Sequence, residues 1–381
     1  MKKTANLTIL ILLLIFSSCS KKDGDLTSSD SMSESSSDNG DQGQAGLITA
    51  GEWNDLLNWF FWKNLLIEQD YLQMSSYWDF HTNNRLSFLV LNSNTPVINA
   101  KVEILRNESV LWTAKTDNHG YAELWVGMFQ REESIDLSNL TIKVNDVIQS
   151  QELVLIENGV NEININSNTD DLNRVEISFI VDATGSMGDE LEFLKEDLKS
   201  VIDRVKNDDA NLDISTSTVF YRDEGDDYVT RKSEFTGDLN KTIDFINQQS
   251  ANGGGDFPEA VHSALNVGIN ELQWSDNAKT RIAFLLLDAP PHYETDIVNN
   301  IHDIIRDASQ KGIKIIPITA SGIDKETEFL MRFMAILTNG TYVFITNDSG
   351  IGNDHLVPSV GQYEVEYLND LMVRLIKEYS E

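Results

Sequence analysis

The sequence predicts a doubly wound α/β fold with a mostly parallel sheet, preceded by a small antiparallel β-sandwich and a tryptophan-rich helical segment. Three observations support this prediction. Residues 173–347 alternate strand-like apolar runs with amphipathic helical patterns. Residues 85–168 contain short β-rich runs separated by turn residues. Residues 48–84 carry Trp53, Trp59, Trp62 and Trp78, most of the tryptophans in the chain.

The α/β region contains apolar runs that do not alternate with polar residues. Such runs are typical of a sheet that is buried on both faces. We expect its strands at 175–182, 212–221, 281–288, 313–319 and 341–346. Residues 348–381 follow as a loop and a final amphipathic helix. Ligands of such a fold bind beyond the carboxyl ends of the strands, so candidate site residues are expected there.

The β-rich region is expected to form a small sandwich. Its strands are predicted at 85–92, 100–107, 109–117, 121–129, 140–146, 149–156 and 161–166. The segment Thr116-Asp117-Asn118-His119-Gly120-Tyr121-Ala122 resembles the T-D-x-x-G-x-A turn of carboxypeptidase-regulatory-like and bacterial Ig-like domains. The resemblance implies that Asp117 and Gly120 shape a hairpin turn and that the sandwich is a spacer.

The tryptophan-rich segment is predicted to form an amphipathic helix over residues 52–68. Its aromatic side chains could form a ligand platform or a membrane-surface anchor. A membrane anchor would have a band of basic residues, and this segment has only Lys63. We therefore expect the aromatic face to pack against the next domain.

The start of the chain has two lysines and then an apolar run from Leu7 to Phe16. The run is too short to span a bilayer, which takes about 20 residues, and it matches a secretory signal. Phe16-Ser17-Ser18-Cys19 resembles the cleavage site of a bacterial lipoprotein. The resemblance implies that residues 1–18 are removed, that Cys19 is lipidated, and that the protein is anchored in the cell envelope. An ordinary signal peptide with an incidental cysteine is the alternative.

Residues 19–47 are polar, acidic and without aromatic residues, so they are expected to form a flexible tether between the membrane and the folded part. Lysines and acidic residues directly after Cys19 resemble the export signal of surface-exposed lipoproteins of some Gram-negative bacteria. This implies the outer membrane, with surface exposure as one outcome. A hydrophilic spacer without an export role is the alternative.

The net charge of −32 excludes nucleic acid as an expected partner. Phosphate backbones are bound by clustered lysines and arginines, and so acidic a protein would repel them. The same field attracts divalent cations.

Oxygen-bearing side chains stand where two predicted strands end. Asp182 ends the first strand, and Thr184 and Ser186 follow it at a spacing of two. Asp288 ends the strand 281–288. These are hard oxygen ligands, which favour Mg²⁺, Mn²⁺ or Ca²⁺ over Zn²⁺. Helix capping by the same residues is the structural alternative.

A glycine-rich segment, A-N-G-G-G-D-F-P-E-A at 251–260, lies between these strands in the sequence. Its glycines permit a close backbone approach, and it carries Asp256 and Glu259 as further oxygen ligands. His292 and the acidic run 221–228 are expected to be surface-loop features, with a second cation site at 221–228 as the alternative.

Together, D-A-T-G-S, G-G-G-D-F-P-E and L-L-L-D-A-P-P-H resemble a von Willebrand factor A domain with a metal-ion-dependent adhesion site. The resemblance covers residues 173–347. It implies a Rossmann-like fold whose D-x-S-x-S motif falls on Asp182, Thr184 and Ser186, with the distal aspartate at Asp288. It also implies a bound cation, with Mg²⁺ expected and Mn²⁺ or Ca²⁺ as alternatives, and a protein or glycan ligand bound through that cation.

One ligand departs from the family pattern. The threonine that usually comes from the middle loop has no match here, and we assign its role to Asp256, with Glu259 as the alternative. A carboxylate at this position would neutralise the cation more fully than a hydroxyl. We therefore expect this site to hold its metal firmly and to recruit an acidic ligand less strongly.

Two other functions remain as alternatives. D-A-T-G-S resembles the D-K-T-G-T of haloacid-dehalogenase-like phosphotransferases, in which the aspartate, here Asp182, is phosphorylated. That chemistry requires a charge-stabilising lysine and a second acidic motif, which the sequence lacks. The other alternative is an envelope scaffold or assembly protein with a structural metal. We expect a binding protein rather than an enzyme.

Overall fold

A computed structural model describes residues 44–132, 134–166, 172–208 and 211–381. The predicted signal peptide, Cys19 and nearly all of the predicted tether lie outside the described residues. Within the described ranges, no helix combines the length and the apolar character needed to cross a membrane.

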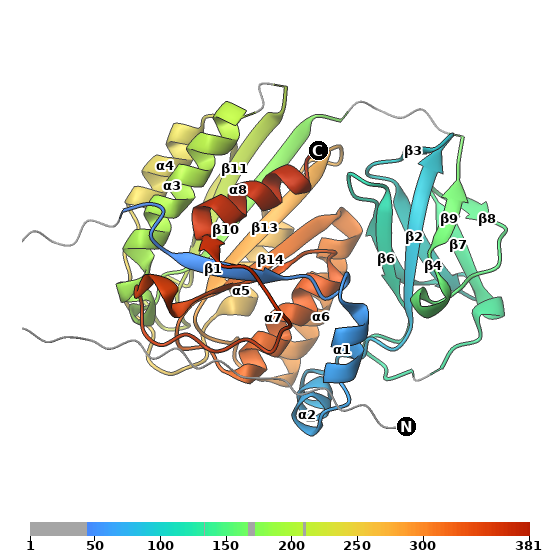
Figure 1. The fold of residues 1–381 in the computed structure, drawn as a ribbon, viewed down its shortest axis with the longest axis horizontal. Helices are drawn as coiled ribbons and strands as arrows, with labels where there is room; N and C mark the ends of the chain where they lie inside the picture. Colours follow the sequence, from blue (N-terminus) through green and yellow to red (C-terminus); the bar gives the residue numbers. More distant parts are fainter. Residues whose placement is uncertain (1–43, 133, 167–171, 209–210) are drawn as a thin grey trace, which may run out of the picture. The chain divides into compact units, whose positions relative to one another are not determined.

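The main sheet has eight strands in the order β12-β11-β10-β13-β14-β15-β1-β16 (Figure 1). They are β1 (Thr49–Trp53), β10 (Arg174–Asp182), β11 (Asp213–Tyr221), β12 (Thr230–Thr236), β13 (Thr280–Leu287), β14 (Ile313–Thr319), β15 (Tyr342–Ile345) and β16 (Glu366–Tyr367). The five central strands from β11 to β15 pair in parallel, whereas β12, β1 and β16 pair antiparallel to their neighbours. The predicted doubly wound, mostly parallel α/β fold is confirmed.

Helices cover both faces of this sheet. One face carries α3 (Leu191–Asp208), α4 (Leu239–Asn247) and α8 (Leu368–Glu378), and the other carries α5 (Val261–Asn266), α6 (Thr295–Lys311) and α7 (Lys325–Leu337). Side chains of β13 alternate between the two cores: Phe284 packs in one and Leu285 in the other, and both are fully buried. Burial on both faces explains why these strands are apolar without alternation.

The first described strand, β1, belongs to this sheet although the sandwich separates it in sequence from the other strands. It pairs antiparallel with β15, with Ala50 opposite Ile345. A Cβ atom at Gly51 would lie 2.7 Å from ring atoms of Phe344 and Tyr363, so this close packing requires glycine. The single helix expected over residues 52–68 is therefore wrong. The structure has β1, then α1 (Trp59–Leu65) and α2 (Gln69–Trp78).

The tryptophans of this segment pack inside the protein, but Trp62 packs against α7 of the α/β part and not against the next domain in the sequence. Trp62 is fully buried; its ring stacks on Phe329 of α7 at a centroid distance of 5.9 Å and meets Phe333 edge-on at 5.4 Å. Trp78 is also buried. Phe60, in contrast, is 79% exposed. The aromatic segment thus forms part of the core beneath α7.

Two small sheets form the inserted β-rich region. One contains β2 (Arg85–Asn92), β3 (Thr95–Pro96), β6 (Tyr121–Trp125) and β9 (Asn161–Asn164), and the other contains β4 (Lys101–Arg106), β5 (Ser109–Lys115), β7 (Leu140–Val144) and β8 (Val147–Gln149). All pairs are antiparallel except β2 with β9. The strand expected at 149–156 is wrong. Asn145 and Asp146 both have positive φ and form a tight turn that places β8 earlier in the chain.

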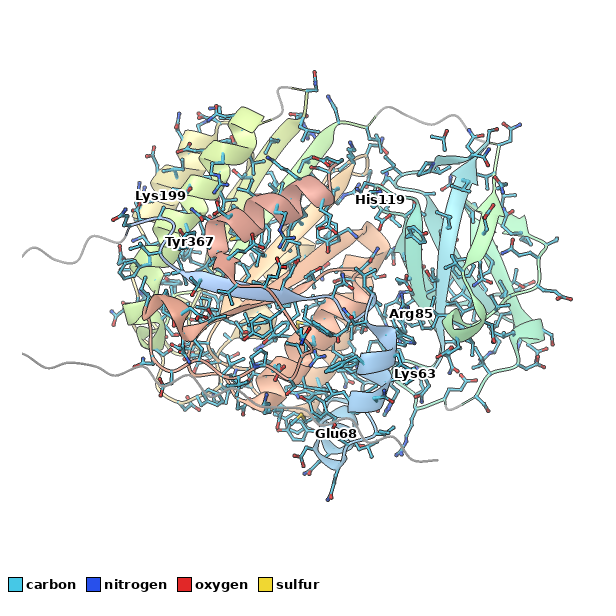
Figure 2. The ribbon with its side chains drawn as sticks, viewed as in Figure 1. Lys63, Glu68, Arg85, His119, Lys199 and Tyr367 are labelled. Atoms are coloured by element: carbon cyan, nitrogen blue, oxygen red, sulfur yellow. The ribbon has the colours of Figure 1, made fainter. Side chains whose placement is uncertain are left out.

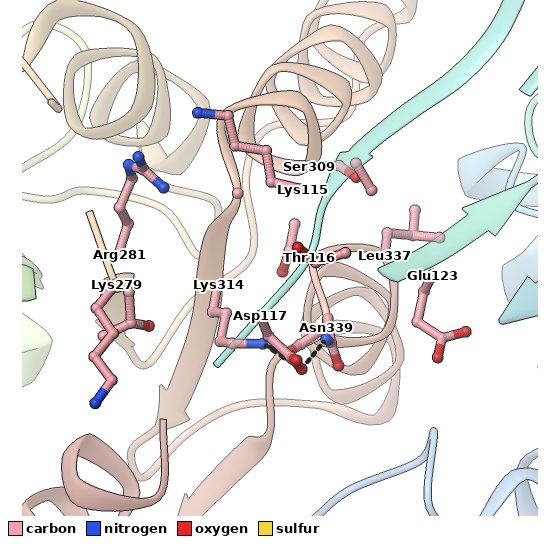
Figure 3. Close-up of a pocket in the computed structure, with 14 residues that line it drawn as sticks. Lys115, Thr116, Asp117, Glu123, Lys279, Arg281, Ser309, Lys314, Leu337 and Asn339 are labelled. Atoms are coloured by element: carbon pink, nitrogen blue, oxygen red, sulfur yellow. Dashed lines mark hydrogen bonds and ion pairs between the residues drawn. The ribbon is translucent and has the colours of Figure 1, made fainter. Parts of the chain in front are cut away.

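Asp117 and Gly120 shape a turn, as the resemblance of residues 116–122 to the T-D-x-x-G-x-A motif implied. Asp117 Oδ1 accepts hydrogen bonds from the backbone N–H groups of His119 and Tyr121 at 3.0 and 2.9 Å, and Gly120 has φ +82°. Asp117 Oδ2 accepts a hydrogen bond from Asn339 at 2.9 Å and pairs with Lys314 at 3.7 Å (Figure 3). The turn therefore also ties the sandwich to the main sheet.

Arg85, labelled in Figure 2, connects the tryptophan-rich segment to the sandwich. Its Nε donates to Glu123 Oε2 at 2.7 Å, and its Nη1 donates to the Leu56 carbonyl at 3.0 Å. The guanidinium lies 4.7 Å from the centre of the Trp59 ring. Arg85 and Glu123 are both buried, and each compensates the charge of the other.

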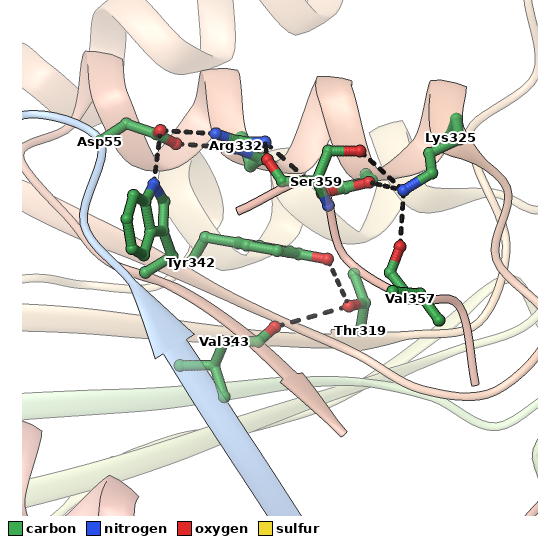
Figure 4. A network of polar contacts seen from close by, with 10 residues as sticks. Asp55, Thr319, Lys325, Arg332, Tyr342, Val343, Val357 and Ser359 are labelled. Carbon is green, nitrogen blue, oxygen red and sulfur yellow. Dashed lines mark hydrogen bonds and ion pairs between the residues drawn. The ribbon is translucent and has the colours of Figure 1, made fainter. Parts of the chain in front are cut away.

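A buried ionic network surrounds Arg332 on α7 (Figure 4). The guanidinium donates from Nε and Nη2 to Asp55 Oδ2 and Oδ1 at 2.9 and 2.6 Å. Its Nη1 donates to the Ser359 carbonyl at 2.7 Å and lies 3.4 Å from Glu328 Oε1. This bidentate geometry joins the segment after β1, helix α7 and the loop before β16.

Replacing Arg332 with alanine is expected to lower the free energy of unfolding by about 3–5 kcal/mol, because Asp55 would remain buried without its cation and Glu328 would keep only Lys325. Urea unfolding measures this. Arg204→Ala is the matched control, because Arg204 and its partner Asp370 are both about half exposed and such pairs contribute less than about 1 kcal/mol. Equal losses of unfolding free energy in the two variants would show that the buried Arg332 network stabilises the protein no more than a surface ion pair does.

Candidate metal centre

Two strand ends that lie side by side in the sheet begin the candidate site. Asp182 is the last residue of β10, and Asp288 directly follows β13, the parallel neighbour of β10. Both side chains are buried. The two strand-end aspartates therefore lie at the same edge of the sheet, because adjacent parallel strands end there.

The loop after β10 folds back on Asp182. Asp182 Oδ1 accepts hydrogen bonds from the backbone N–H of Thr184 at 2.8 Å and from its hydroxyl at 2.7 Å. The hydroxyl groups of Thr184 and Ser186 are 3.0 Å apart. Thr184 precedes the short 3-10 helix Gly185–Asp189, but its side chain makes no capping hydrogen bond to it. Its hydroxyl instead faces Asp182, which does not support the helix-cap interpretation for Thr184.

The glycine-rich loop packs directly against this loop. Asn252 N–H donates to the Ala183 carbonyl at 3.0 Å, and Gly185 N–H donates to the Gly253 carbonyl at 3.1 Å. Gly254 has φ +72°, and a Cβ atom there would lie 2.8 Å from Glu259 Oε1 and 3.3 Å from Thr184 Cβ. Only glycine permits this approach, as the sequence suggested.

The structure separates the two candidates in the glycine-rich loop. The Asp256 side chain is exposed, whereas Glu259 is buried to 3% exposure. The Glu259 backbone N–H donates to the Pro290 carbonyl at 2.9 Å, which fixes it beside the loop that follows Asp288. Glu259, the alternative in the sequence analysis, is thus the carboxylate that lies with Asp182.

Like charges and burial dominate the electrostatics of this edge. Burial raises the pKa of Asp182 to about 7, and the nearby Asp288 carboxylate adds to the increase. Burial also raises the pKa of Glu259 to about 9, with further increases from Asp182, Asp223 and Asp288. Both groups therefore favour a proton, or another cation, at this edge.

Two carboxylate oxygen atoms of this group are suitable for a cation. Asp182 Oδ2 and Glu259 Oε2 are buried and accept no hydrogen bond of good geometry from any described residue, although the Tyr221 hydroxyl lies close enough to Asp182 to lower its pKa. A buried carboxylate oxygen without a donor is costly unless a cation or proton compensates it. With the hydroxyl oxygens of Thr184 and Ser186, they form a set of hard oxygen donors, so the residues present fit a divalent cation.

Carboxylates and histidines alone do not complete a site. Across the described ranges, no three His, Cys, Asp or Glu side chains are grouped closely enough to hold a metal ion. Hydroxyl oxygens would therefore have to be part of the ligand set.

Two buried residues that the sequence analysis missed support these loops. Arg222 donates from Nε to the Ala183 carbonyl at 3.2 Å and from Nη2 to the Ser250 carbonyl at 3.0 Å. Glu190 Oε1 accepts from the Ser321 backbone N–H at 3.1 Å and lies 3.1 Å from His355 Nε2. Neither has a local sequence signal, because every partner comes from a different part of the chain.

The acidic run 221–228 is partly built into the structure. Asp226 Oδ2 accepts hydrogen bonds from the backbone N–H groups of Asp223 and Gly254 at 3.1 and 2.8 Å. Asp223 Oδ1 lies 2.7 Å from His292 Nε2. His292 thus has a specific partner beside the candidate site, and Asp226 holds the glycine-rich loop in place.

Comparison with known proteins gives partial matches. Residues 176–350 match the von Willebrand factor A domain family. The ariadne-like RING finger protein R811 of Acanthamoeba polyphaga mimivirus is 35% identical over 126 residues, which is 33% of this chain and 12% of that protein. The alpha-protein kinase vwkA of Dictyostelium discoideum is 32% identical over 121 residues, 31% of this chain and 19% of that protein. This chain therefore spans less than one fifth of the length of either relative.

Two solved structures also resemble part of this chain, each with 14% sequence identity. An aerotolerance-related membrane protein from Bacteroides fragilis NCTC 9343 has a TM-score of 0.34, and BatB from Bacteroides thetaiotaomicron has one of 0.35. Both alignments cover 54% of this chain and 98% of the other. The family match coincides with the strands and helices around Asp182 and Asp288. Residues 176–350 of this chain are therefore similar in sequence to a von Willebrand factor A domain.

Proposed function

We propose that this protein binds a divalent cation at the edge formed by Asp182, Thr184, Ser186, Glu259 and Asp288 and, through that cation, a protein or glycan ligand. A von Willebrand factor A domain indicates a role in protein interaction or adhesion. The observation that carries the metal site is the pair of buried carboxylate oxygens, on Asp182 and Glu259, that accept no hydrogen bond of good geometry from a described residue. The proposed role is binding rather than catalysis.

Each side chain has a distinct part in the proposal. Asp182 supplies charge from the strand end, and the Thr184 and Ser186 hydroxyls supply neutral oxygens beside it. Glu259 takes the place first assigned to Asp256. We expect Mg²⁺, since the donors are hard oxygens, with Mn²⁺ or Ca²⁺ as alternatives. When bound, the cation would supply positive charge for an oxygen of the ligand.

Glu259 also affects how strongly an acidic ligand would be recruited. A carboxylate in the ligand set neutralises more of the cation's charge than the threonine of the family pattern would. We therefore expect firm metal binding combined with weaker capture of acidic groups. A cation whose charge is largely neutralised by its protein ligands has less need of a further anion. This site is therefore suited to neutral oxygen ligands, such as glycan hydroxyls or amide carbonyls.

Location in the cell envelope is a further part of the proposal. It rests on the resemblance of the first 19 residues to a lipoprotein signal with Cys19 as the lipidated residue. Metabolic labelling with a fatty-acid probe tests it: label incorporated in the natural chain and lost in Cys19→Ala is expected. Label retained in that variant, or absent from both proteins, would contradict lipidation.

Calorimetric titration of Mg²⁺, Mn²⁺ and Ca²⁺ tests the metal site in the full chain. One-site binding is expected. Asp182→Asn should weaken it by more than about 100-fold, which exceeds the effect of losing an outer partner of a metal ligand. Glu259→Gln should weaken it by at least about tenfold, because a charged ligand becomes neutral.

Asp256→Asn is the matched control for Glu259→Gln, because Asp256 comes from the same loop but is exposed. The metal affinity of Asp256→Asn should equal that of the natural chain. A large loss in Asp256→Asn together with no loss in Glu259→Gln would reverse the assignment, and no binding in any protein would contradict the metal site.

The thermal effect of Mg²⁺ should depend on pH. In the metal-free protein, Asp182 has its pKa raised from 3.8 to about 7, so its ionisation lowers stability as pH rises between these values. Glu259, raised from 4.5 to about 9, extends the loss to higher pH. A cation needs the ionised forms, so the gain in Tm from Mg²⁺ over EDTA should increase as pH rises through 7. A gain that is constant with pH, or largest at acidic pH, would contradict the account.

A further inference from the structure

A second polar pocket lies at the opposite edge of the main sheet from the metal centre. Its volume is about 450 Å³. Arg281 stands at the amino end of β13, and Lys311 lies just before β14, whereas Asp182 and Asp288 mark carboxyl ends of strands. The sandwich contributes Lys101 and Lys115. Because it uses other residues at another edge, this pocket is independent of the proposed metal site.

The pocket is basic on a strongly acidic protein. Four of its lining residues carry positive charge, Lys101, Lys115, Arg281 and Lys311, and Asp276 is the acidic one. The whole chain has 61 acidic and 29 basic residues. A local excess of positive charge therefore runs against the composition. Amide side chains also line the pocket and add hydrogen-bond donors.

Lys115 and Lys311 both contact neutral oxygens. Lys115 Nζ donates to the Asp276 carbonyl at 3.0 Å. Lys311 Nζ donates to the Ile269 carbonyl at 2.9 Å and to Asn270 Oδ1 at 2.6 Å. Among the ion pairs of the described residues, neither ammonium has a carboxylate partner. Lys101 differs, because it pairs with Asp146 at 2.6 Å.

Arg281 is held rigidly beside Lys115. Its Nε and Nη2 donate to the carbonyls of Ser275 and Asp276 at 2.9 and 2.7 Å, and its Nη1 donates to Asn99 Oδ1 at 3.0 Å. Its ion-pair partner Glu176 is 4.0 Å away. Figure 3 shows the charged ends of Lys115 and Arg281 extending toward each other. The cations are thus placed by the fold rather than by neighbouring carboxylates.

Burial is the main cause of the lowered pKa of these cations, and nearby carboxylates offset it only in part. Burial lowers the pKa of Lys115 to about 8, and the adjacent Arg281 guanidinium adds to the decrease. Burial also lowers the pKa of Lys311 and of Arg281. An anion placed among these groups would favour their charged forms.

We propose that this pocket binds a doubly charged oxyanion, phosphate or sulfate, either free or as an ester group of a larger molecule. Two ammonium groups and a guanidinium can donate to several oxygens of one tetrahedral anion. A carboxylate offers one charge and two oxygens, so it matches this set less well. The pocket has room for more than the anion itself, which allows an attached sugar-sized group.

Calorimetric titration of the full chain in EDTA buffer tests the proposal, with sodium sulfate, inorganic phosphate, glucose 6-phosphate and acetate as separate probes. Saturable binding of at least one dianion is expected, with acetate at least tenfold weaker. Tighter binding of the sugar phosphate would identify an ester group as the ligand, and tighter binding of the inorganic ions would identify a free anion.

Lys115→Met and Lys311→Met should each weaken binding of the dianion at least tenfold. Lys241→Met is the control, because the Lys241 side chain is 73% exposed on α4, outside the pocket. Its affinity should match that of the natural chain, and circular dichroism confirms that all three variants fold. No saturable binding by the natural chain, equal binding of acetate, or equal affinity in all variants would overturn the proposal.

Discussion

The burial of like charges at one edge of the main sheet is the constraint on which the site depends. Asp182 and Glu259 are nearly inaccessible, and Asp288 adds a third negative group beside them. In a medium of low dielectric such charges raise one another's pKa unless a cation compensates them. The surrounding loops keep these carboxylates out of contact with solvent. Arg222 holds the loop after β10 by its carbonyl, and the glycine-rich loop seals the other side.

The chain path makes the sandwich an insertion into one sheet. β1 lies between β15 and β16 and forms before the chain leaves for the sandwich, and β10 then begins the parallel part. Buried polar contacts fasten the inserted region: Asp117 reaches Lys314, and the Trp112 indole N–H donates to Ser309 Oγ at 3.0 Å. The same junction creates the basic pocket, since Lys115 comes from the sandwich and Arg281 from the sheet. The sandwich therefore contributes side chains to the proposed anion pocket.

The sequence predicted what local patterns determine and failed where distant contacts decide. The central strands were predictable because burial on both faces requires continuous apolar runs, and Asp182 and Asp288 come directly after those runs in the sequence. β1 was not predictable, because its partner strand lies near the other end of the chain. Glu259 rather than Asp256 lies at the site because its backbone N–H donates a hydrogen bond to the Pro290 carbonyl. No spacing within the loop reveals this contact. Glu190 likewise acquires its role only when His355 and Ser321 are brought to it.

The central claim is that the buried edge at Asp182 and Glu259 is a cation site. Anomalous X-ray diffraction from crystals of the full chain grown with Mn²⁺ tests it most directly. We expect one strong anomalous peak in contact with Asp182, Glu259 and at least one of the hydroxyls of Thr184 and Ser186. No peak at this edge, with the Thr184 hydroxyl still hydrogen-bonded to Asp182, would contradict the cation site and leave these residues with a structural role only.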